Sequence, residues 1–360
     1  AWHVTVGTSL VEVALDTGEI TANGKHEALC ELEFELLSGD ANALLVLATE
    51  VADTVPVRLG KASKAQRGYR LAGQSKPLAL SALEFLPLPV PEDLNLHQPH
   101  QQDLTATCQV LLETALERWQ LLEAMIADEQ DNEAQIALWW RMRACIRLLR
   151  MTLSQFGLAN ATLMHQFNLI ESQLTFIEEA QALAALLGSQ KGLLTRHDAR
   201  QALMQQLQLQ FEAMDISGRL NLLWQRVEYG QLQLAIVEIL LALSAGNIEL
   251  PAELGLSHHA DHAQEASWQA ILAAMPSDKT MTAEDYLQCA ALLDESIQIG
   301  QAYGLLYEAK SRDAFRAPWQ DLVLGIRTLA CYRQLTLAAK SLGVDLTEWL
   351  EDKQQSLLFA

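Results

Sequence analysis

The stretch CELEFELLSGD, residues 30–40, decides how the first part of the chain folds. Three glutamates, Glu31, Glu33 and Glu35, alternate in it with leucine and phenylalanine. Successive side chains of a strand point to opposite faces, so this period of two indicates a β-strand with one apolar face. We therefore expect a row of carboxylates on the other face, with neighbours roughly 6.5–7 Å apart.

A second strand of the same kind precedes it. In VEVALD, residues 11–16, Glu12 and Asp16 share one face while valine and leucine fill the other. If both strands pair as a hairpin, five carboxylates share one surface: Glu12, Asp16, Glu31, Glu33 and Glu35. Crowded carboxylates raise one another's pKa unless a cation offsets them, and oxygen-rich sites of this kind suit Mg²⁺ or Mn²⁺. The alternative is an ordinary solvent-exposed face of an antiparallel sheet.

The rest of residues 1–75 is also predicted to be mainly β. WHVTV reads as another strand, and DTGEI and ANGKHE hold the turn residues between strands. Asp40 is a candidate cap for a helix through ANALLVLATEVADT. KASKAQRGYRLA, residues 61–72, is predicted to be a last strand or extended segment. Its basic side chains, beside a carboxylate-held metal, are what a polyphosphate substrate needs. They are Lys61, Lys64, Arg67 and Arg70.

The pattern changes beyond this segment. Five of the nine prolines fall in residues 76–102, which are predicted to form an extended linker. From 103 to 360, apolar residues recur at helical spacing and predict an all-α bundle. The expected helices lie near 103–128, 132–156, 160–188, 196–214, 219–245, 264–274, 282–309, 319–342 and 345–357. The predicted fold class is α+β, predominantly α.

Composition limits the partners. The chain has 25 Lys and Arg against 45 Asp and Glu, a net charge of −20, which disfavours nucleic acid and anionic membranes. Five irregularly spaced cysteines are typical of reduced core thiols, so we expect a cytoplasmic protein. We find no uncharged apolar run of about 18 residues and expect no membrane span. The chain begins inside a predicted strand, so we expect it to be a fragment or a processed product.

The first part of the chain resembles the C-terminal half of a CYTH domain, the triphosphate tunnel metalloenzyme fold. The resemblance rests on the order of four pieces: VEVALDTGEI, CELEFELLSGD, a predicted helix and KASKAQRGYRLA. With the linker and helices behind it, the chain resembles the bacterial inorganic triphosphatases that join a CYTH domain to a CHAD domain. The resemblance implies part of an antiparallel β tunnel in which carboxylates hold Mg²⁺ or Mn²⁺. It also implies hydrolysis of inorganic triphosphate by water that attacks a terminal phosphorus.

The resemblance assigns roles to particular residues. Glu33 and Asp16 fall at catalytic positions of the family, where carboxylates orient the water. The implied metal ligands are Asp16, Glu31, Glu33 and Glu35. Lys64 falls on the phosphate-binding lysine, and Arg67 lies in the same motif. The family's opening ExExK strand and its middle strands are absent from this sequence, so we expect the chain alone to be inactive.

IALWWRMRACIRLLR, residues 136–150, resembles the first basic helix of a CHAD domain, with Trp140 where that family has histidine. Arg143, Arg147 and Arg150 match its arginines, and no acidic residue occurs from 134 to 170. The resemblance implies polyphosphate binding by Arg143 and Arg147. The second basic helix of such a domain is degenerate here. The alternative is therefore a structural or protein-binding bundle, with these arginines paired to acids on neighbouring helices.

A histidine-rich segment, HHADHAQE, adds one further candidate. His258 and His262 are four residues apart, a spacing that suits a metal only on a helix. We expect an exposed loop and an incidental polar helix start instead.

Overall fold

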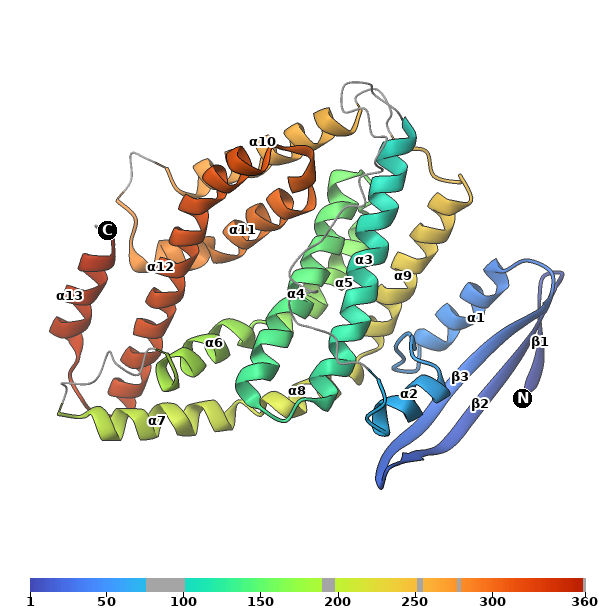
Figure 1. Cartoon of the computed structure of the whole chain (residues 1–360), viewed down its shortest axis with the longest axis horizontal. Helices are drawn as coiled ribbons and strands as arrows, with labels where there is room; N and C mark the ends of the chain where they lie inside the picture. Colours follow the sequence, from blue (N-terminus) through green and yellow to red (C-terminus); the bar gives the residue numbers. More distant parts are fainter. Residues whose placement is uncertain (76–100, 190–197, 251–254, 277–279, 359–360) are drawn as a thin grey trace. The chain divides into compact units, whose positions relative to one another are not determined.

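The computed structural model describes residues 1–75, 101–189, 198–250, 255–276 and 280–358 (Figure 1). It contains a three-stranded antiparallel sheet followed by helices, which confirms the predicted mixed, mainly helical fold class. The chain divides into two compact units. The first comprises Ala1–Glu84, Ala161–Ile170 and Asn221–Ile248, and the second comprises Phe85–Asn160, Glu171–Leu220 and Glu249–Ala360. The predicted linker at 76–102 lies almost wholly outside the described residues, so the three-part division 1–75, 76–102 and 103–360 stays a prediction.

The sheet is a hairpin with a short third strand at one edge. β1 (Trp2–Val6), β2 (Ser9–Ala22) and β3 (Lys25–Ser38) follow in the order β1-β2-β3. Asn23 and Gly24 join β2 to β3, both with positive φ (53° and 73°), as the tight turns of hairpins require. The turn expected in DTGEI is wrong, because Gly18 pairs with Leu29 inside the ladder and the strands continue past it.

The apolar face of the hairpin is covered by α1 (Asn42–Ala52). Val11 is fully buried there and clusters with Ala43 and Leu47. Asp40 is not the residue that caps this helix, which begins one position later than such a cap requires. Its carboxylate still accepts a 2.9 Å hydrogen bond from the Asn42 N–H, so it satisfies one exposed donor of the first turn.

The strand expected in KASKAQRGYRLA is wrong, because α2 (Lys64–Leu71) is a helix. Ser63 and Gln66 form a capping box: the Ser63 hydroxyl accepts from the Gln66 N–H, and the Gln66 side chain accepts from the Ser63 N–H. Lys64, Arg67 and Arg70 are three residues apart. In a helix this spacing puts all three cations on one face, whereas a strand would separate them.

The remaining helices follow the predicted pattern with changed boundaries. They are α3 (Gln101–Asp128), α4 (Asn132–Gln155), α5 (Ala161–Ser172), α6 (Phe176–Leu187), α7 (Arg200–Ala213), α8 (Arg219–Trp224), α9 (Val227–Ser244), α10 (Leu256–Ala274), α11 (Ala283–Ala302), α12 (Ala309–Leu342) and α13 (Thr347–Leu358). Two expected helices are each split in two, and α12 continues through Pro318, where a break was expected. α10 begins at Leu256, so the histidine-rich segment is helical and not a loop.

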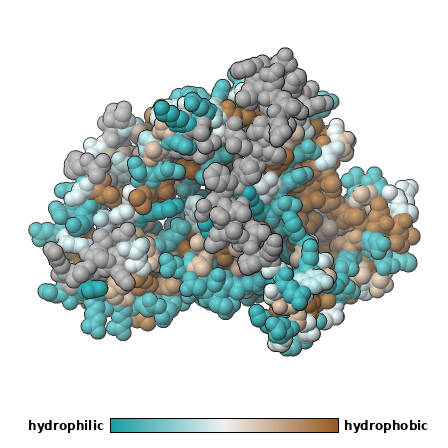
Figure 2. Space-filling view, viewed as in Figure 1, coloured by the Kyte–Doolittle hydropathy of each residue, from teal (hydrophilic) through white to brown (hydrophobic). Residues whose placement is uncertain are grey.

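In the first unit, α9 fixes the segment between α1 and α2. The Gln233 side chain accepts a 2.9 Å hydrogen bond from the Leu59 N–H, and a Cβ at Gly230 would meet the Val57 carbonyl oxygen at 2.3 Å. Among the described residues α9 alone is long and apolar enough to cross a membrane, by length and composition only, and it carries Glu228 and Glu238, so the expectation of no membrane span stays a prediction. A core helix passes the same test. In Figure 2, hydrophobic residues gather on the side where α1 and α9 lie.

The second unit buries apolar side chains from most of its helices, and Ile271, Cys289, Leu293 and Ile326 form one cluster among them. Trp119 of α3 and Trp139 and Met142 of α4 are fully buried, and the Trp139 ring packs edge-on against Phe176 of α6. All five cysteines are free, as expected, but Cys30 is exposed on the edge strand β3 and is not a core thiol. The other four are buried. Burial raises the pKa of the Cys108 thiol to about 12, so that thiol stays protonated and unreactive at neutral pH.

Candidate metal and phosphate site

The hairpin register brings the predicted carboxylates onto one face of the sheet. Glu12 pairs with Glu35, and Asp16 pairs with Glu31. Glu33 lies opposite the small Ala14, which leaves room above the sheet for the longer side chains on either side. The alternation read in the sequence therefore gives the predicted surface of five carboxylates.

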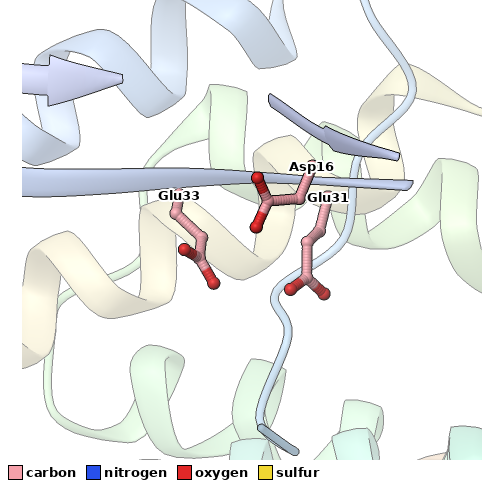
Figure 3. A group of neighbouring side chains, drawn as sticks. All are labelled: Asp16, Glu31 and Glu33. Atoms are coloured by element: carbon pink, nitrogen blue, oxygen red, sulfur yellow. The ribbon is translucent and has the colours of Figure 1, made fainter. Parts of the chain in front are cut away.

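Three of these carboxylates converge. One oxygen each of Asp16, Glu31 and Glu33 lies within 4.8 Å of the other two, and Figure 3 shows all three side chains turned to the same side of the strands. Glu35 lies outside this group, although it was predicted as a metal ligand. The Glu12 Oε2 lies 3.0 Å from the His3 Nε2, at the far end of the row. We call Asp16, Glu31 and Glu33 the carboxylate cluster.

The helix α2 places a cation at the centre of the carboxylate cluster. The Lys64 Nζ lies 2.7 Å from Asp16 Oδ2, 2.9 Å from Glu31 Oε1 and 2.6 Å from Glu33 Oε1. Hydrogen bonds to Asp16, Glu33 and Glu31 raise the pKa of Lys64, so it is fully charged at neutral pH. Lys64 was predicted to bind phosphate, and the structure shows it bound to the predicted metal ligands.

Arg67 and Arg70 extend this contact along α2 and involve a residue that the sequence analysis missed. Arg67 donates to Glu27 Oε1 at 2.6 Å and to Glu31 Oε2 at 3.1 Å, and Arg70 donates to Glu27 Oε2 at 2.5 Å. Burial alone would raise the pKa of Glu27, but the hydrogen bonds from Arg67 and Arg70 outweigh it and lower that pKa. Glu27 has the same strand parity as Glu31, which is the signal that could have identified it.

The donor set fits a hard divalent cation. Mg²⁺ and Mn²⁺ prefer carboxylate oxygens, and three of them from two paired strands can serve one ion while water completes its coordination. Glu33 has the most exposed side chain of the cluster, at 56%, and Glu31 the least, at 28%. The cluster is thus open to solvent on the side of Glu33.

The arginines of α4 lie in a different environment, inside the second unit. Arg143 and Arg147 are 3% and 8% exposed. Arg143 pairs closely with Glu178 of α6, and Arg147 Nη1 lies 3.2 Å from Asp294 Oδ2 of α11. The Asp294 carboxyl is itself buried, which raises its pKa despite the neighbouring arginines.

Arg150 is the third arginine of α4 that pairs with acids of neighbouring helices. It lies 3.2 Å from Glu171 at the end of α5 and pairs closely with Glu295 of α11. The three arginines therefore face four acids, and Arg327 also acts on Asp294. Within this group of described residues the charges balance, which leaves no surplus positive charge for an external anion. These partners lie outside the acid-free interval from 134 to 170, and the pairing agrees with the alternative drawn from the sequence, in which the arginines pair with acids on neighbouring helices.

Comparisons with known proteins support this description in part. No protein-family model matches the chain. A stretch of 77 residues, 20% of the chain, is 36% identical to the inorganic triphosphatase of Haemophilus influenzae, and it spans only 21% of that protein. The crystal structure of the CHAD domain from the plant Ricinus communis matches 72% of the chain and 89% of that domain, with a TM-score of 0.52 and 19% identity.

A match over 72% of the chain must include most of the helical region, because the sheet, α1 and α2 together end at residue 71. At this identity the match shows the fold alone. The chain thus contains a helical region with the fold of a CHAD domain, preceded by a three-stranded antiparallel sheet that carries the carboxylate cluster.

Proposed function

We propose that the chain belongs to a metal-dependent hydrolase of inorganic triphosphate. The observation that carries this proposal is the convergence of Asp16, Glu31 and Glu33 beside the cationic face of α2. Metal-binding carboxylates next to lysine and arginine are the groups that a polyphosphate needs, because the anion must be neutralised on several oxygens at once. The stretch shared with a protein named inorganic triphosphatase supports the same chemistry.

In this proposal Asp16, Glu31 and Glu33 hold Mg²⁺ or Mn²⁺. When bound, such an ion polarises phosphoryl oxygens and makes a bound water more acidic. Lys64 and Arg67 donate hydrogen bonds to the phosphate chain. Glu33, the most exposed member of the cluster, accepts the proton of the water that attacks a terminal phosphorus, with Asp16 orienting that water. The P–O–P bond breaks, and phosphate and pyrophosphate leave.

The described residues supply one side of such a site. Their sheet is open, with three strands in the order β1-β2-β3, and it does not surround a substrate. The cations that contact the carboxylate cluster in the described part of the chain, Lys64 and Arg67, both belong to α2. We therefore propose that this chain by itself turns over triphosphate slowly or not at all, and that further strands are needed for full activity.

The test is phosphate release from inorganic triphosphate with Mg²⁺, measured on this chain and on the longest product of its gene. The proposal expects turnover in a form that completes the site, and loss of at least about a hundredfold in Glu33→Gln with unchanged circular dichroism. Glu19→Gln, a glutamate of the same strand pair outside the carboxylate cluster, serves as the matched control. Turnover of Glu33→Gln at the level of the control would refute the assignment.

A second candidate function rests on the CHAD fold of the helical region. A bundle of this fold could bind polyphosphate or a protein without catalysis. Such binding would have to displace Glu178 and Asp294 from Arg143 and Arg147, since these acids occupy the arginines in the structure. Binding of polyphosphate by the chain that weakens with rising salt concentration would support this function.

A further inference from the structure

Lys64 occupies the place that a metal would take. Its ammonium has three N–H donors, and each can reach one carboxylate of the cluster, at 2.6 to 2.9 Å. A divalent ion bound by the same three oxygens would lie about 2.0–2.1 Å from each of them. The Lys64 Nζ already lies within hydrogen-bond distance of all three oxygens, so an ion that binds all three cannot enter while the ammonium stays there.

Because Lys64 lies at the start of α2, displacement of its ammonium would also affect how α2 is attached to the sheet. Lys64 is the first residue of the helix, directly after the capping residue Ser63. Arg67 and Arg70 hold the following turns of the helix to Glu27, and Arg67 also reaches Glu31. Loss of the Lys64 contacts would therefore free the first turn of α2, while the second turn stays attached to β3.

We propose that Lys64 is an internal competitor for the metal site: loading of a divalent cation ejects its ammonium from the carboxylate cluster and releases the first turn of α2 from the sheet. This inference rests on the proposed function, because it assumes that the cluster binds a metal. The released ammonium is then free to bind phosphate. The same side chain thus neutralises the carboxylates when no metal is bound and binds the anion when the metal is bound. Cation loading and anion binding become coupled through α2.

The experiment is Mn²⁺ binding to the full chain in the absence of phosphate, followed by calorimetry and by the electron paramagnetic resonance of free Mn²⁺. Lys64→Gln removes the competing ammonium and keeps a polar side chain. It is expected to tighten Mn²⁺ binding on the order of tenfold, since the lost ion pairs are partly exposed and individually weak. Arg70→Gln is the charge-matched control. It removes one positive charge from the same helix but from the partner of Glu27, and it is expected to change the affinity less than about twofold.

The outcomes separate the inference from the proposed function. Equal Mn²⁺ affinities of wild type and Lys64→Gln would overturn the competition and leave the metal site standing. No binding by either protein would overturn both. Tightening by Arg70→Gln as large as by Lys64→Gln would also overturn it, because it would show a general charge effect. Glu33→Gln in the Lys64→Gln background should abolish the gain.

Hydrogen exchange supplies a second readout that does not depend on affinity. Saturating Mn²⁺ is expected to speed amide exchange in the first turn of α2 in the wild-type chain. The same addition should leave Lys64→Gln, whose helix is already detached at that end, unchanged. Unaltered or slower exchange in wild-type α2 on Mn²⁺ loading would contradict the release of the helix.

Discussion

Replacing Arg147 with methionine is expected to destabilise the protein, because it removes the side chain that hydrogen-bonds the largely buried Asp294. The Arg147 side chain is 9% exposed and that of Asp294 is 17% exposed, so water screens their 3.2 Å contact only weakly. Breaking a buried ion pair from one side typically costs about 3–5 kcal/mol. Since Asp294 keeps some contact with water, we expect a loss of about 3 kcal/mol in the free energy of unfolding.

The same pair predicts a dependence on pH. Burial raises the folded-state pKa of Asp294 above its ordinary value of 3.8, and removal of Arg147 takes away a neighbour that opposes this shift. A carboxyl with a raised folded pKa binds its proton more readily in the folded state than in the unfolded state. The deficit of Arg147→Met should therefore be largest near pH 8 and shrink as the pH falls through the folded pKa of Asp294.

The assay is equilibrium unfolding in urea, followed by tryptophan fluorescence, which reports on the fully buried Trp139 of the same helix. The double variant Arg147→Met with Asp294→Leu should return to within about 1 kcal/mol of wild type, because both charges are then gone. Lys340→Met, which removes an exposed cation, should cost less than about 0.5 kcal/mol. A loss below about 0.5 kcal/mol in Arg147→Met would refute the reasoning and return Arg147 to the candidates for binding an anion.

Three further predictions follow from other contacts. Ser63→Ala removes one side of the capping box and should weaken α2 by about 1 kcal/mol. Amide exchange in Lys64–Leu71 should be faster in the variant than in wild type, with exchange in α1 as the reference; equal exchange in the two proteins would contradict it. Burial, and to a lesser degree His262, lowers the pKa of His259 from 6.5 to about 4, so stability should fall between pH 6.5 and 4, where only the unfolded state gains the proton. In His259→Phe the urea midpoint of unfolding should change less between pH 6.5 and 4 than in wild type. An unchanged slope would assign this pH dependence to other groups. Asp294→Asn removes an internal competitor of Arg147 and should strengthen any retention of polyphosphate, whereas weaker retention would show that the arginine does not meet the polymer.

Local patterns were sufficient to predict the hairpin and most helices. The period of two in residues 11–16 and 30–36 places Glu12 opposite Glu35 and Asp16 opposite Glu31, because strand parity and an Asn-Gly turn fix the register. The helix α2 was missed because its eight residues carry little hydrophobic pattern, although the Ser63–Gln66 capping signal was present. Glu27 was missed because the alternation was followed only as far back as Glu31.

The sequence by itself determined which residues could form a carboxylate row and which could form a basic face. Only the tertiary structure decided what these charges meet. Lys64 contacts Glu33, which is 31 residues away, and Arg147 contacts Asp294, which is 147 residues away. The sequence around a lysine or arginine does not specify which acid it will pair with. The partner depends on which helix or strand the packing of the apolar core brings within reach of the side chain. Packing of apolar faces sets those distances, and the ion pairs follow from them.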